Sequence, residues 1–372
     1  MQVSLLRNVS EERNLSMKLY ADRLTSGLKN RCALENFYPW NPPYINRTGL
    51  GMIDKGMNYA ARFGVYPSSL LRRRADVFHI LDHGNAHLLS CLPSRRTVVT
   101  CHDLMLLKLA SGEFGKDAVV PRVASKFFNA SLRFLKSARL VVAVSDATAK
   151  DLIRLVGIDG KRIRVVPNGI DSQFAMPQDI NARREARARL NLNGQPILLH
   201  VGNNWFYKNL EGLIRALAIL RAGSKRNPPL LVKVGKRLTS AQSALAASLN
   251  VSDCIRQVGV LDGEELQRMY WASDVLVFPS LCEGFGWPPL EAMASGTPVV
   301  CSNRGSLGEV VGDAATIINP EKPESIAEGI SSVLNDEHLR RALILKGLQR
   351  ARQFTWERAA KETFQVYQEV VN

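Results

Sequence analysis

The chain has 372 residues, a length that suggests about two domains rather than a single hydrophobic core. Apolar residues make up 46% and charged residues 22% of it, which excludes disorder or coiled coil for most of the chain. No apolar run approaches the ~18 residues that a membrane span requires, and the apolar stretch at the amino terminus is too short for a signal peptide. We therefore expect a cytoplasmic protein. The six cysteines form no Cys-x-x-Cys pair, which predicts reduced thiols rather than a disulfide framework or a zinc site.

The net charge of +15 is unevenly distributed along the chain. Residues 1–186 carry +12, whereas residues 187–372 carry +3. The runs Arg72–Arg74 and Arg95–Arg96 contribute to this excess. A basic excess can attract nucleic acid, anionic lipid head groups or a phosphorylated substrate, or it can simply form a solvated face.

Short β-branched runs alternate with stretches of helical period, which predicts an α/β protein with parallel sheets flanked by helices. The strands expected in the first half are 3–6, 77–81, 97–100, 140–144 and 163–166. Those expected in the second half are 196–202, 230–234, 255–258, 275–278, 298–301 and 315–318, with helices at 210–220, 263–271 and 289–294. The last segment, 355–371, has the pattern of a single amphipathic helix.

A polar, helix-prone segment at 181–190 follows the turn signal Pro-Asn-Gly-Ile-Asp at 167–171. We place the domain boundary there, with a first domain at 1–178, a second at 190–352 and a terminal helix at 353–372. The simplest architecture is two doubly wound domains that face each other across a cleft, with the ligand at the carboxyl ends of the strands.

The most informative segment is the Gly-rich turn at 279–298, between a buried strand and a short helix. Glu283 lies in the turn and Glu291 just inside the helix. Gly284 and Gly286 allow the backbone to approach a ligand, and the helix start offers N–H groups suited to phosphate. A carboxylate at each end can accept hydrogen bonds from two sugar hydroxyls. The alternative is that one of them only caps the helix.

This segment resembles the Glu-x7-Glu signature of retaining glycosyltransferases of family 4, which have the two-domain GT-B fold. Five other segments resemble the family in the same order: 144–151, 166–171, 199–210, 258–274 and 354–357. They correspond to the last strand of the N-terminal domain, the interdomain segment, the phosphate-binding loop, the nucleotide-side helix and the start of the terminal helix. The resemblance covers most of the chain and implies that this terminal helix crosses back onto the N-terminal domain.

The resemblance also implies roles for individual residues. Glu291 would hold the ribose hydroxyls, Glu283 the hydroxyls of the donor hexose, and Lys208 the diphosphate as it leaves. Electrostatics supports the last role, because a fixed ammonium stabilises a departing diphosphate; the alternative is a solvated lysine. The remaining residues expected at the donor site are Gly202, Asn203, Gly235, Lys236, Arg256 and the backbone of Gly284, Phe285 and Gly286.

One departure from the family concerns the second cation at the diphosphate. Many members have an arginine shortly after the glycine that ends the first strand of the C-terminal domain. Here Gly202 is followed by Asn203-Asn-Trp-Phe-Tyr207, without an arginine before Lys208. The candidates for a replacement are Lys236, Arg237 and Arg256, and the sequence does not choose among them.

In the N-terminal domain, His102 ends a buried strand and resembles the family's histidine that contacts the transferred sugar, although a strand-end histidine is more often structural. Asp103 could hold its imidazole or cap the next helix. We expect Asp82 and His83 to line the acceptor side of the cleft. The spacing of His79, His83 and His87 would suit a metal only on a helix, whereas 77–81 predicts a strand. In the first loop, residues 7–12 replace the family's Gly-Gly pair, and a role for Asn8 or Ser10 stays open.

The chain contains no Asp-x-Asp, so we expect transfer without a metal or other cofactor. The sequence predicts a retaining glycosyltransferase that moves a hexose from a nucleotide diphosphate sugar to a glycan or lipid-linked acceptor in surface polysaccharide synthesis. Similarity to bacterial polysaccharide mannosyltransferases favours GDP-mannose. One alternative is a nucleotide-sugar epimerase or hydrolase on the same fold. Another is a nucleic-acid-binding module, which leaves the Glu pair unexplained, so we expect no nucleic acid. A lipid-linked acceptor would require peripheral contact with the anionic inner face of the membrane.

Overall fold

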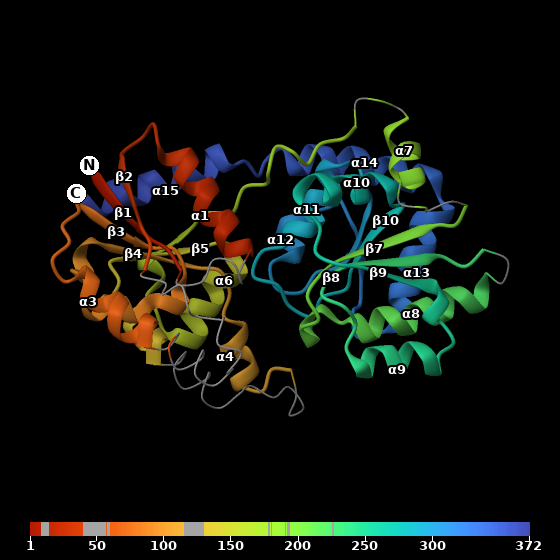
Figure 1. Ribbon diagram of the computed structural model, residues 1–372, viewed down its shortest axis with the longest axis horizontal. Coiled ribbons are helices and arrows are strands. Elements are labelled where there is room, and N and C mark those ends of the chain that lie inside the picture. Colours follow the sequence, from red (N-terminus) through yellow and green to blue (C-terminus); the bar gives the residue numbers. More distant parts are fainter. Residues whose placement is uncertain are drawn as a thin grey trace. The chain divides into compact units, whose positions relative to one another are not determined.

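The computed structural model describes residues 1–8, 15–39, 57, 60–114, 130–177, 179, 181–189, 191, 194–224 and 227–372. The chain forms two compact units, which are coloured along the sequence in Figure 1. Unit 1 contains residues 1–169 and 356–372, and unit 2 contains residues 170–355. Residues 170–178, which the sequence analysis assigned to the first domain, therefore belong to unit 2.

Unit 1 is built on a six-stranded parallel sheet with the order β2-β1-β3-β4-β5-β6. Its strands are β1 (Gln2–Leu6), β2 (Ala33–Phe37), β3 (Val77–Ile80), β4 (Thr97–Cys101), β5 (Leu140–Ala143) and β6 (Ile163–Val165). The five predicted strands are confirmed, and the residues of β3, β4 and β5 are all buried, as expected where helices cover both faces. The edge strand β2 was not predicted.

Helices of several lengths connect the strands of unit 1. They are α1 (Leu15–Leu28), α3 (Tyr66–Leu70), α4 (Met105–Ala110), α6 (Asp146–Asp151) and α15 (Trp356–Val371), with π-helical turns at Ala61–Val65 and Leu152–Val156 and 3₁₀ turns at His83–Ser90, Ser94–Arg96 and Gly160–Arg162. Within the described residues, none of the helices is both long and apolar enough to cross a membrane.

The terminal helix α15 packs against α1 within unit 1, where Figure 1 shows the two side by side. A Cβ on Gly27 would lie only 2.6 Å from the Cβ of Ala360, so the close approach of the two helices requires glycine. Tyr367 of α15 lies fully buried, with its Oη 2.6 Å from His79 Nδ1 in β3. The terminal helix is thus part of the core of unit 1.

Unit 2 contains a second six-stranded parallel sheet, with the order β12-β11-β10-β7-β8-β9. Its strands are β7 (Ile197–Gly202), β8 (Leu230–Gly235), β9 (Ile255–Val258), β10 (Val275–Phe278), β11 (Val299–Ser302) and β12 (Thr316–Ile318). All six predicted strands are confirmed. The helices are α7 (Ala182–Arg189), α8 (Leu210–Gly223), α9 (Ser240–Ser248), α10 (Gly263–Ala272), α11 (Trp287–Ala294), α12 (Leu307–Val311), α13 (Pro323–Asn335) and α14 (Glu337–Ala351).

Each sheet reverses its strand order at one point. In unit 1 the chain passes from β1 outward to β2 and then to β3 on the other side of β1; in unit 2 it passes from β7 outward to β9 and then to β10 on the other side of β7. In doubly wound sheets the connections diverge at such a point and leave a crevice at the carboxyl ends of the two strands. The segments that follow β1, β3, β7 and β10 therefore define where a ligand can bind in each unit.

Candidate active site

Two charged side chains meet where β7 and β10 end. Lys208 closes a 3₁₀ turn (Phe206–Lys208) directly before α8, and Glu283 lies in the Gly-rich turn after β10. Lys208 Nζ is 2.6 Å from Glu283 Oε1, and only 12% and 11% of the two side chains are exposed. The ammonium also lies 5.4 and 4.9 Å from the ring centroids of Tyr207 and Phe278. The two residues predicted to bind different parts of the donor thus form an ion pair with each other.

The loop after β11 holds the turn that carries Glu283. Ser306 donates from its backbone N to Glu283 O at 3.1 Å and from Oγ to Phe285 O at 2.5 Å. Gly305 has a φ of +62°, and a Cβ at this position would overlap the backbone of Glu283. Gly286 has a φ of +123° and faces the side chain of Leu307 closely. The glycines therefore permit a tightly supported turn.

Glu291 lies on α11 and is buried, with 8% of the residue exposed. Tyr270 of α10 donates a hydrogen bond from Oη to Glu291 Oε2 at 2.6 Å. Burial raises the pKa of Glu291 to about 7, against a lowering effect of the Tyr270 hydrogen bond and together with repulsion from Asp171. Tyr270 leaves Oε1 unused, so the carboxylate can accept further hydrogen bonds. Its charge depends on pH near neutrality.

The loops after β7 and β8 are joined to each other. Gly202 and Gly235 are paired in register, with φ values of +154° and +105°, and a Cβ on Gly235 would overlap Gly202 O. Asn203 Oδ1 accepts a hydrogen bond from Trp205 N at 3.1 Å and so shapes its own loop. The side-chain amide of Asn204 donates a hydrogen bond to the backbone carbonyl of Arg237, in the loop after β8. The two strand-end loops therefore act as one element.

The three candidates for the second cation have different positions. Lys236 and Arg237 are exposed in the loop after β8, at the same edge of the sheet as Lys208. Arg256 lies within β9, and its Nη1 donates a hydrogen bond to Asn191 O at 3.3 Å. Asn191 precedes β7 in the chain. The structure thus does not bring Arg256 to the crevice, because its side chain is held at the opposite edge of the sheet.

The structure adds a residue that the sequence analysis missed. Lys233 of β8 is fully buried, and its Nζ donates to the carbonyls of Gly202 at 2.6 Å, Lys236 at 3.0 Å and Val234 at 3.1 Å. The neighbouring His200 of β7 is also fully buried. A lysine inside the apolar run of β8 was the signal that could have indicated this. Tyr270 and Ser306 were missed too, and they carry no comparable signal, because their partners lie far away in sequence.

Polar side chains also gather in unit 1, where β1 and β3 end. Asn8 Nδ2 donates to Asp82 Oδ2 at 2.9 Å, and Gly84 N donates to Asp82 Oδ1 at 2.8 Å. His83 Nδ1 is 3.4 Å from the same Oδ1. Burial alone would raise the pKa of Asp82, but two neighbouring histidines and these hydrogen bonds lower it to about 2. The structure therefore brings Asn8, Asp82 and His83 together, whereas Ser10 lies outside the described residues.

His102 directly follows β4 and is held by the backbone of the neighbouring strand. Its Nε2 lies 2.8 Å from Leu81 O; because a carbonyl only accepts, Nε2 carries the proton and Nδ1 is the acceptor nitrogen. Burial lowers the pKa of His102, which favours the neutral ring. Asp103 does not hold this imidazole. Its Oδ1 accepts a hydrogen bond from Met105 N, the first residue of α4, at 2.9 Å, so Asp103 bonds the start of the next helix, although the N-cap position itself is Leu104.

The three histidines of the i, i+4, i+8 pattern do not form a cluster. His79 lies in β3 and bonds Tyr367 and Thr100, whereas His87 Nε2 lies 2.9 Å from Arg62 O. Within the part of the chain that the structure describes, no three His, Cys, Asp or Glu residues are arranged to hold a metal ion. Only His79 lies in the strand at 77–80, whereas His83 and His87 lie in the 3₁₀ turn His83–Ser90 that follows it, so the three side chains do not share one helix face.

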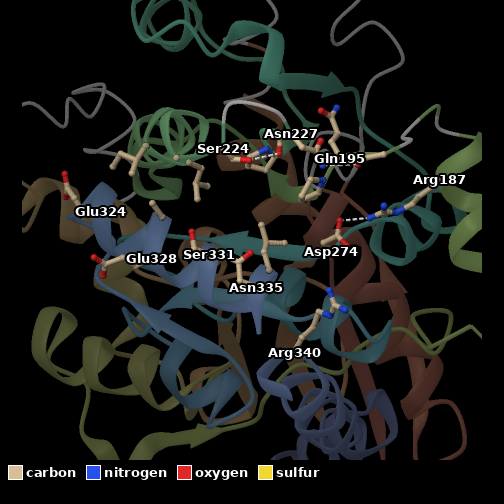
Figure 2. Close-up of a pocket in the computed structure, with 18 residues that line it drawn as sticks. Arg187, Gln195, Ser224, Asn227, Asp274, Glu324, Glu328, Ser331, Asn335 and Arg340 are labelled. Atoms are coloured by element: carbon tan, nitrogen blue, oxygen red, sulfur yellow. Dashed lines mark hydrogen bonds and ion pairs between the residues drawn. The ribbon is translucent and has the colours of Figure 1, made fainter. Parts of the chain in front are cut away.

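A cavity of about 730 Å³ lies in unit 2 away from these residues (Figure 2). Asp274, which precedes β10, lines it together with Gln195 before β7 and Asn335 of α13. Figure 2 shows Asp274 bound by Arg187 of α7. The cavity therefore lies at the amino-terminal edge of the sheet, opposite the Lys208–Glu283 pair, and is not the predicted donor site.

The comparisons with known proteins agree with this arrangement. Residues 182–350 match the family model "Glycosyl transferases group 1", and residues 37–174 match "Glycosyltransferase Family 4". The chain is 32% identical over 286 residues to O-antigen chain mannosyltransferase B of Escherichia coli, covering 74% of this chain and 71% of that protein. Sucrose-phosphate synthase of Thermosynechococcus elongatus superposes with a TM-score of 0.77 at 22% identity, covering 99% and 98% of the two chains. Anabaena HepE, solved with UDP and glucose, superposes with a TM-score of 0.73 at 18% identity, covering 99% and 100%.

Two doubly wound parallel units with this structural likeness define the GT-B fold. The two family models together span most of the chain, and each matches one side of residue 178. The chain belongs to the family 4 (group 1) glycosyltransferases, and it is a glycosyltransferase.

Proposed function

We propose that this glycosyltransferase is retaining and metal-independent and transfers mannose from GDP-mannose to a glycan or lipid-linked acceptor in surface polysaccharide synthesis. The observation that carries the proposal is the Lys208–Glu283 pair at the β7–β10 crevice, with Glu291 on the helix that follows. The similarity to the O-antigen mannosyltransferase supports mannose, and the HepE complex with UDP and glucose supports a nucleotide sugar as donor.

In this proposal each charged residue binds one part of the donor. Glu291 accepts hydrogen bonds from the ribose hydroxyls through the oxygen that Tyr270 leaves unused, and Glu283 accepts hydrogen bonds from hydroxyls of the hexose. Lys208 stabilises the negative charge that builds on the departing diphosphate. Because Lys208 and Glu283 are paired with each other in the free protein, donor binding must exchange their mutual contact for contacts with the ligand.

Retention is explained here without a covalent enzyme intermediate. The acceptor oxygen bonds to the anomeric carbon while the bond to the diphosphate breaks on the same face, and the acceptor proton passes to the departing phosphate oxygen. The protein then needs to position both substrates rather than to supply a nucleophile. The ion pair of Glu283 and the hydrogen bond to Glu291 suit carboxylates that bind the donor rather than attack it.

A thermal-shift screen over nucleoside diphosphates and their sugars, followed by a transfer assay, tests the proposal. A ligand at a hundred times its dissociation constant stabilises by about 2.7 kcal/mol, which is enough to identify the base. We expect guanosine diphosphate and GDP-mannose to stabilise most, and transfer to persist with EDTA. Donor turnover that acceptor does not accelerate would favour a hydrolase or epimerase. Affinity for nucleic acid that falls steeply with salt, without any response to nucleotide sugars, would favour the binding module.

His102 is proposed to contact the transferred sugar from unit 1, as the family resemblance implies. We expect His102→Ala to lower kcat at least tenfold with little change in the Kd for free nucleoside diphosphate, because its acceptor Nδ1 faces no part of the nucleotide in this proposal. His338→Ala, an exposed histidine of α14, is the control. Calorimetry and initial rates on both variants measure the effect. Turnover at the wild-type rate in His102→Ala would remove this residue from the site.

Peripheral membrane contact is the remaining part of the proposal, and the basic run Arg72–Arg74 is the surface proposed to make it. Arg72–Arg74 are exposed, follow α3 and precede β3, beside Leu71, of which 67% is exposed. Together with Gln2 they line a cavity of about 490 Å³. They therefore occupy the amino-terminal edge of the unit 1 sheet, whereas Asp82 and His102 occupy the opposite edge.

We expect the protein to sediment with anionic vesicles at low salt and to be released at roughly 0.5 M NaCl, because each basic residue near such a surface contributes about 1 kcal/mol that salt screens. Arg73 pairs with Glu35 and lies over Phe37, so Arg72→Gln with Arg74→Gln should weaken binding most. Arg341→Gln with Lys346→Gln, both exposed on α14, removes the same charge from unit 2 and is the control. Wild-type protein that ignores anionic vesicles at low salt would favour an acceptor in solution.

A further inference from the structure

The ammonium group of Lys233 lies beneath the two loops that end β7 and β8. Its three acceptors are all backbone carbonyls: Gly202 O at 2.6 Å, Lys236 O at 3.0 Å and Val234 O at 3.1 Å. They belong to both strands, and the residue has no exposed surface. Burial of a lysine ammonium costs free energy unless polar groups compensate its charge. The three carbonyls provide that compensation here.

The bonds to Lys233 set the direction of the strand-end peptides. Gly202 O points to the Lys233 ammonium and crowds Gly235, which can lie so close only because it lacks a Cβ. When a peptide carbonyl points into the protein, the N–H of the same peptide points the opposite way. The amide of Asn203, which shares its peptide with Gly202 O, is therefore directed away from Lys233. Successive N–H groups of this kind form concavities that bind anions.

Lys233 also contributes charge near Lys208. Burial and the positive charge of Lys208 lower the pKa of Lys233 to about 8. The adjacent His200 bonds Val277 O through Nδ1 at 3.1 Å, and burial, Lys233 and Lys208 lower its pKa to about 3, so it stays neutral. On α8, the carboxylate of Glu211 accepts a hydrogen bond from Gln242 of α9 at 2.9 Å. Two ammonium groups therefore lie near this edge of the sheet. That of Lys208 is paired with the Glu283 carboxylate, whereas that of Lys233 is bonded by three backbone carbonyls.

We propose that Lys233 is the positioning residue of the diphosphate site: it orients the strand-end amides toward the diphosphate and supplies the second positive charge that no arginine after Gly202 provides. This inference rests on the proposed function, because it assumes a nucleoside diphosphate at the β7–β10 crevice. Lys233 does not touch the ligand. It acts through the carbonyls of Gly202 and Lys236 and through its charge, so neither Lys236 nor Arg237 is required for that charge.

The test compares Lys233→Met, which keeps the length and removes the charge, with Lys233→Arg, which keeps a charge that does not titrate. Calorimetry with guanosine diphosphate and with guanosine is run on both and on the wild type, with the exposed Lys346→Met as the control. We expect Lys233→Met to lose at least tenfold in affinity for the diphosphate and less than threefold for the nucleoside. We expect Lys233→Arg to recover most of the diphosphate affinity.

The pH dependence separates this role from a purely structural one. Wild-type affinity for the diphosphate should fall as pH rises through about 8, where Lys233 loses its proton, and this fall should be absent in Lys233→Arg. If Lys233→Met does not fold, the pH dependence of the wild type and Lys233→Arg decides alone. An equal fall in diphosphate affinity in the wild type and Lys233→Arg overturns the inference. Equal diphosphate affinity in folded Lys233→Met and wild type also overturns it. A wild type that binds no nucleoside diphosphate overturns the proposed function, and this inference with it.

Discussion

Replacement of Glu283 by glutamine is expected to abolish hexose transfer while the affinity for free nucleoside diphosphate stays equal to that of the wild type or rises. In the free protein, Lys208 is neutralised by Glu283 at 2.6 Å, and both side chains are almost completely buried. A diphosphate must compete with that carboxylate for the ammonium group. Glutamine removes the competing charge, so the cost of separating the pair disappears from the binding free energy.

The same change should lower the stability of the free protein. Removal of one partner from a buried ion pair leaves a charge without compensation, and such changes cost about 3–5 kcal/mol when burial is complete. We therefore expect a lower Tm for Glu283→Gln without ligand and a larger gain in Tm on addition of diphosphate than in the wild type. This opposite movement of stability and affinity is the signature of a contact that the ligand replaces.

Lys208→Met is the matched variant for this experiment, because it removes the other half of the same pair. It should lower diphosphate affinity at least tenfold, consistent with the loss of a charge-assisted contact worth about 1.5–3 kcal/mol. Calorimetry on both variants and the double variant gives the coupling energy between them. A tenfold loss of diphosphate affinity in Glu283→Gln would contradict the assignment of Glu283 to the hexose.

The sequence predicted the parts of the fold that depend on local pattern. Eleven of the twelve strands were expected, most of them because a buried parallel strand is a continuous apolar run that is visible without its neighbours. The exception, β2, lies at the edge of its sheet, has no buried residue and contains Glu35 and Asn36. Its pairing with β1 is a tertiary contact, and no local pattern reports it.

The candidate site was predicted in outline for the same reason. Lys208 and Glu283 were expected at one edge because both follow buried strands, but their ion pair depends on which strands are neighbours in the sheet. Arg256 was one of three open candidates inside the predicted strand 255–258, and the structure excludes it because its side chain bonds Asn191 O, before β7. The alternatives for Asp103 differed in its partner, the imidazole of His102 or the start of the next helix, and that choice depends on the backbone geometry that brings Met105 N to Asp103.

Glu291 should make nucleotide binding depend on pH near neutrality. Burial raises its pKa to about 7, so the carboxylate that is proposed to accept the ribose hydroxyls is lost as pH falls through about 7. Affinity should fall with it. Stability should move the other way: a group whose pKa is higher in the folded than in the unfolded protein favours folding most at low pH, and that contribution is lost as pH rises through about 7. Acidification from pH 8 to 6 thus weakens the complex while this group stabilises the free protein.

Tyr270→Phe should move this transition to higher pH, because the Tyr270 hydrogen bond opposes the rise in the pKa of Glu291. Phenylalanine keeps the edge-on packing against Phe174, whose ring centroid is 5.8 Å away. Glu291→Gln should abolish the transition and weaken diphosphate and donor alike by about ten- to a hundredfold, the loss of charge-assisted hydrogen bonds. The terminal phosphate of the ligand titrates near pH 6 as well, so only the differences between variants report on Glu291. Calorimetric titrations at several pH values measure all three proteins, and a wild-type transition that persists in Glu291→Gln would contradict the assignment.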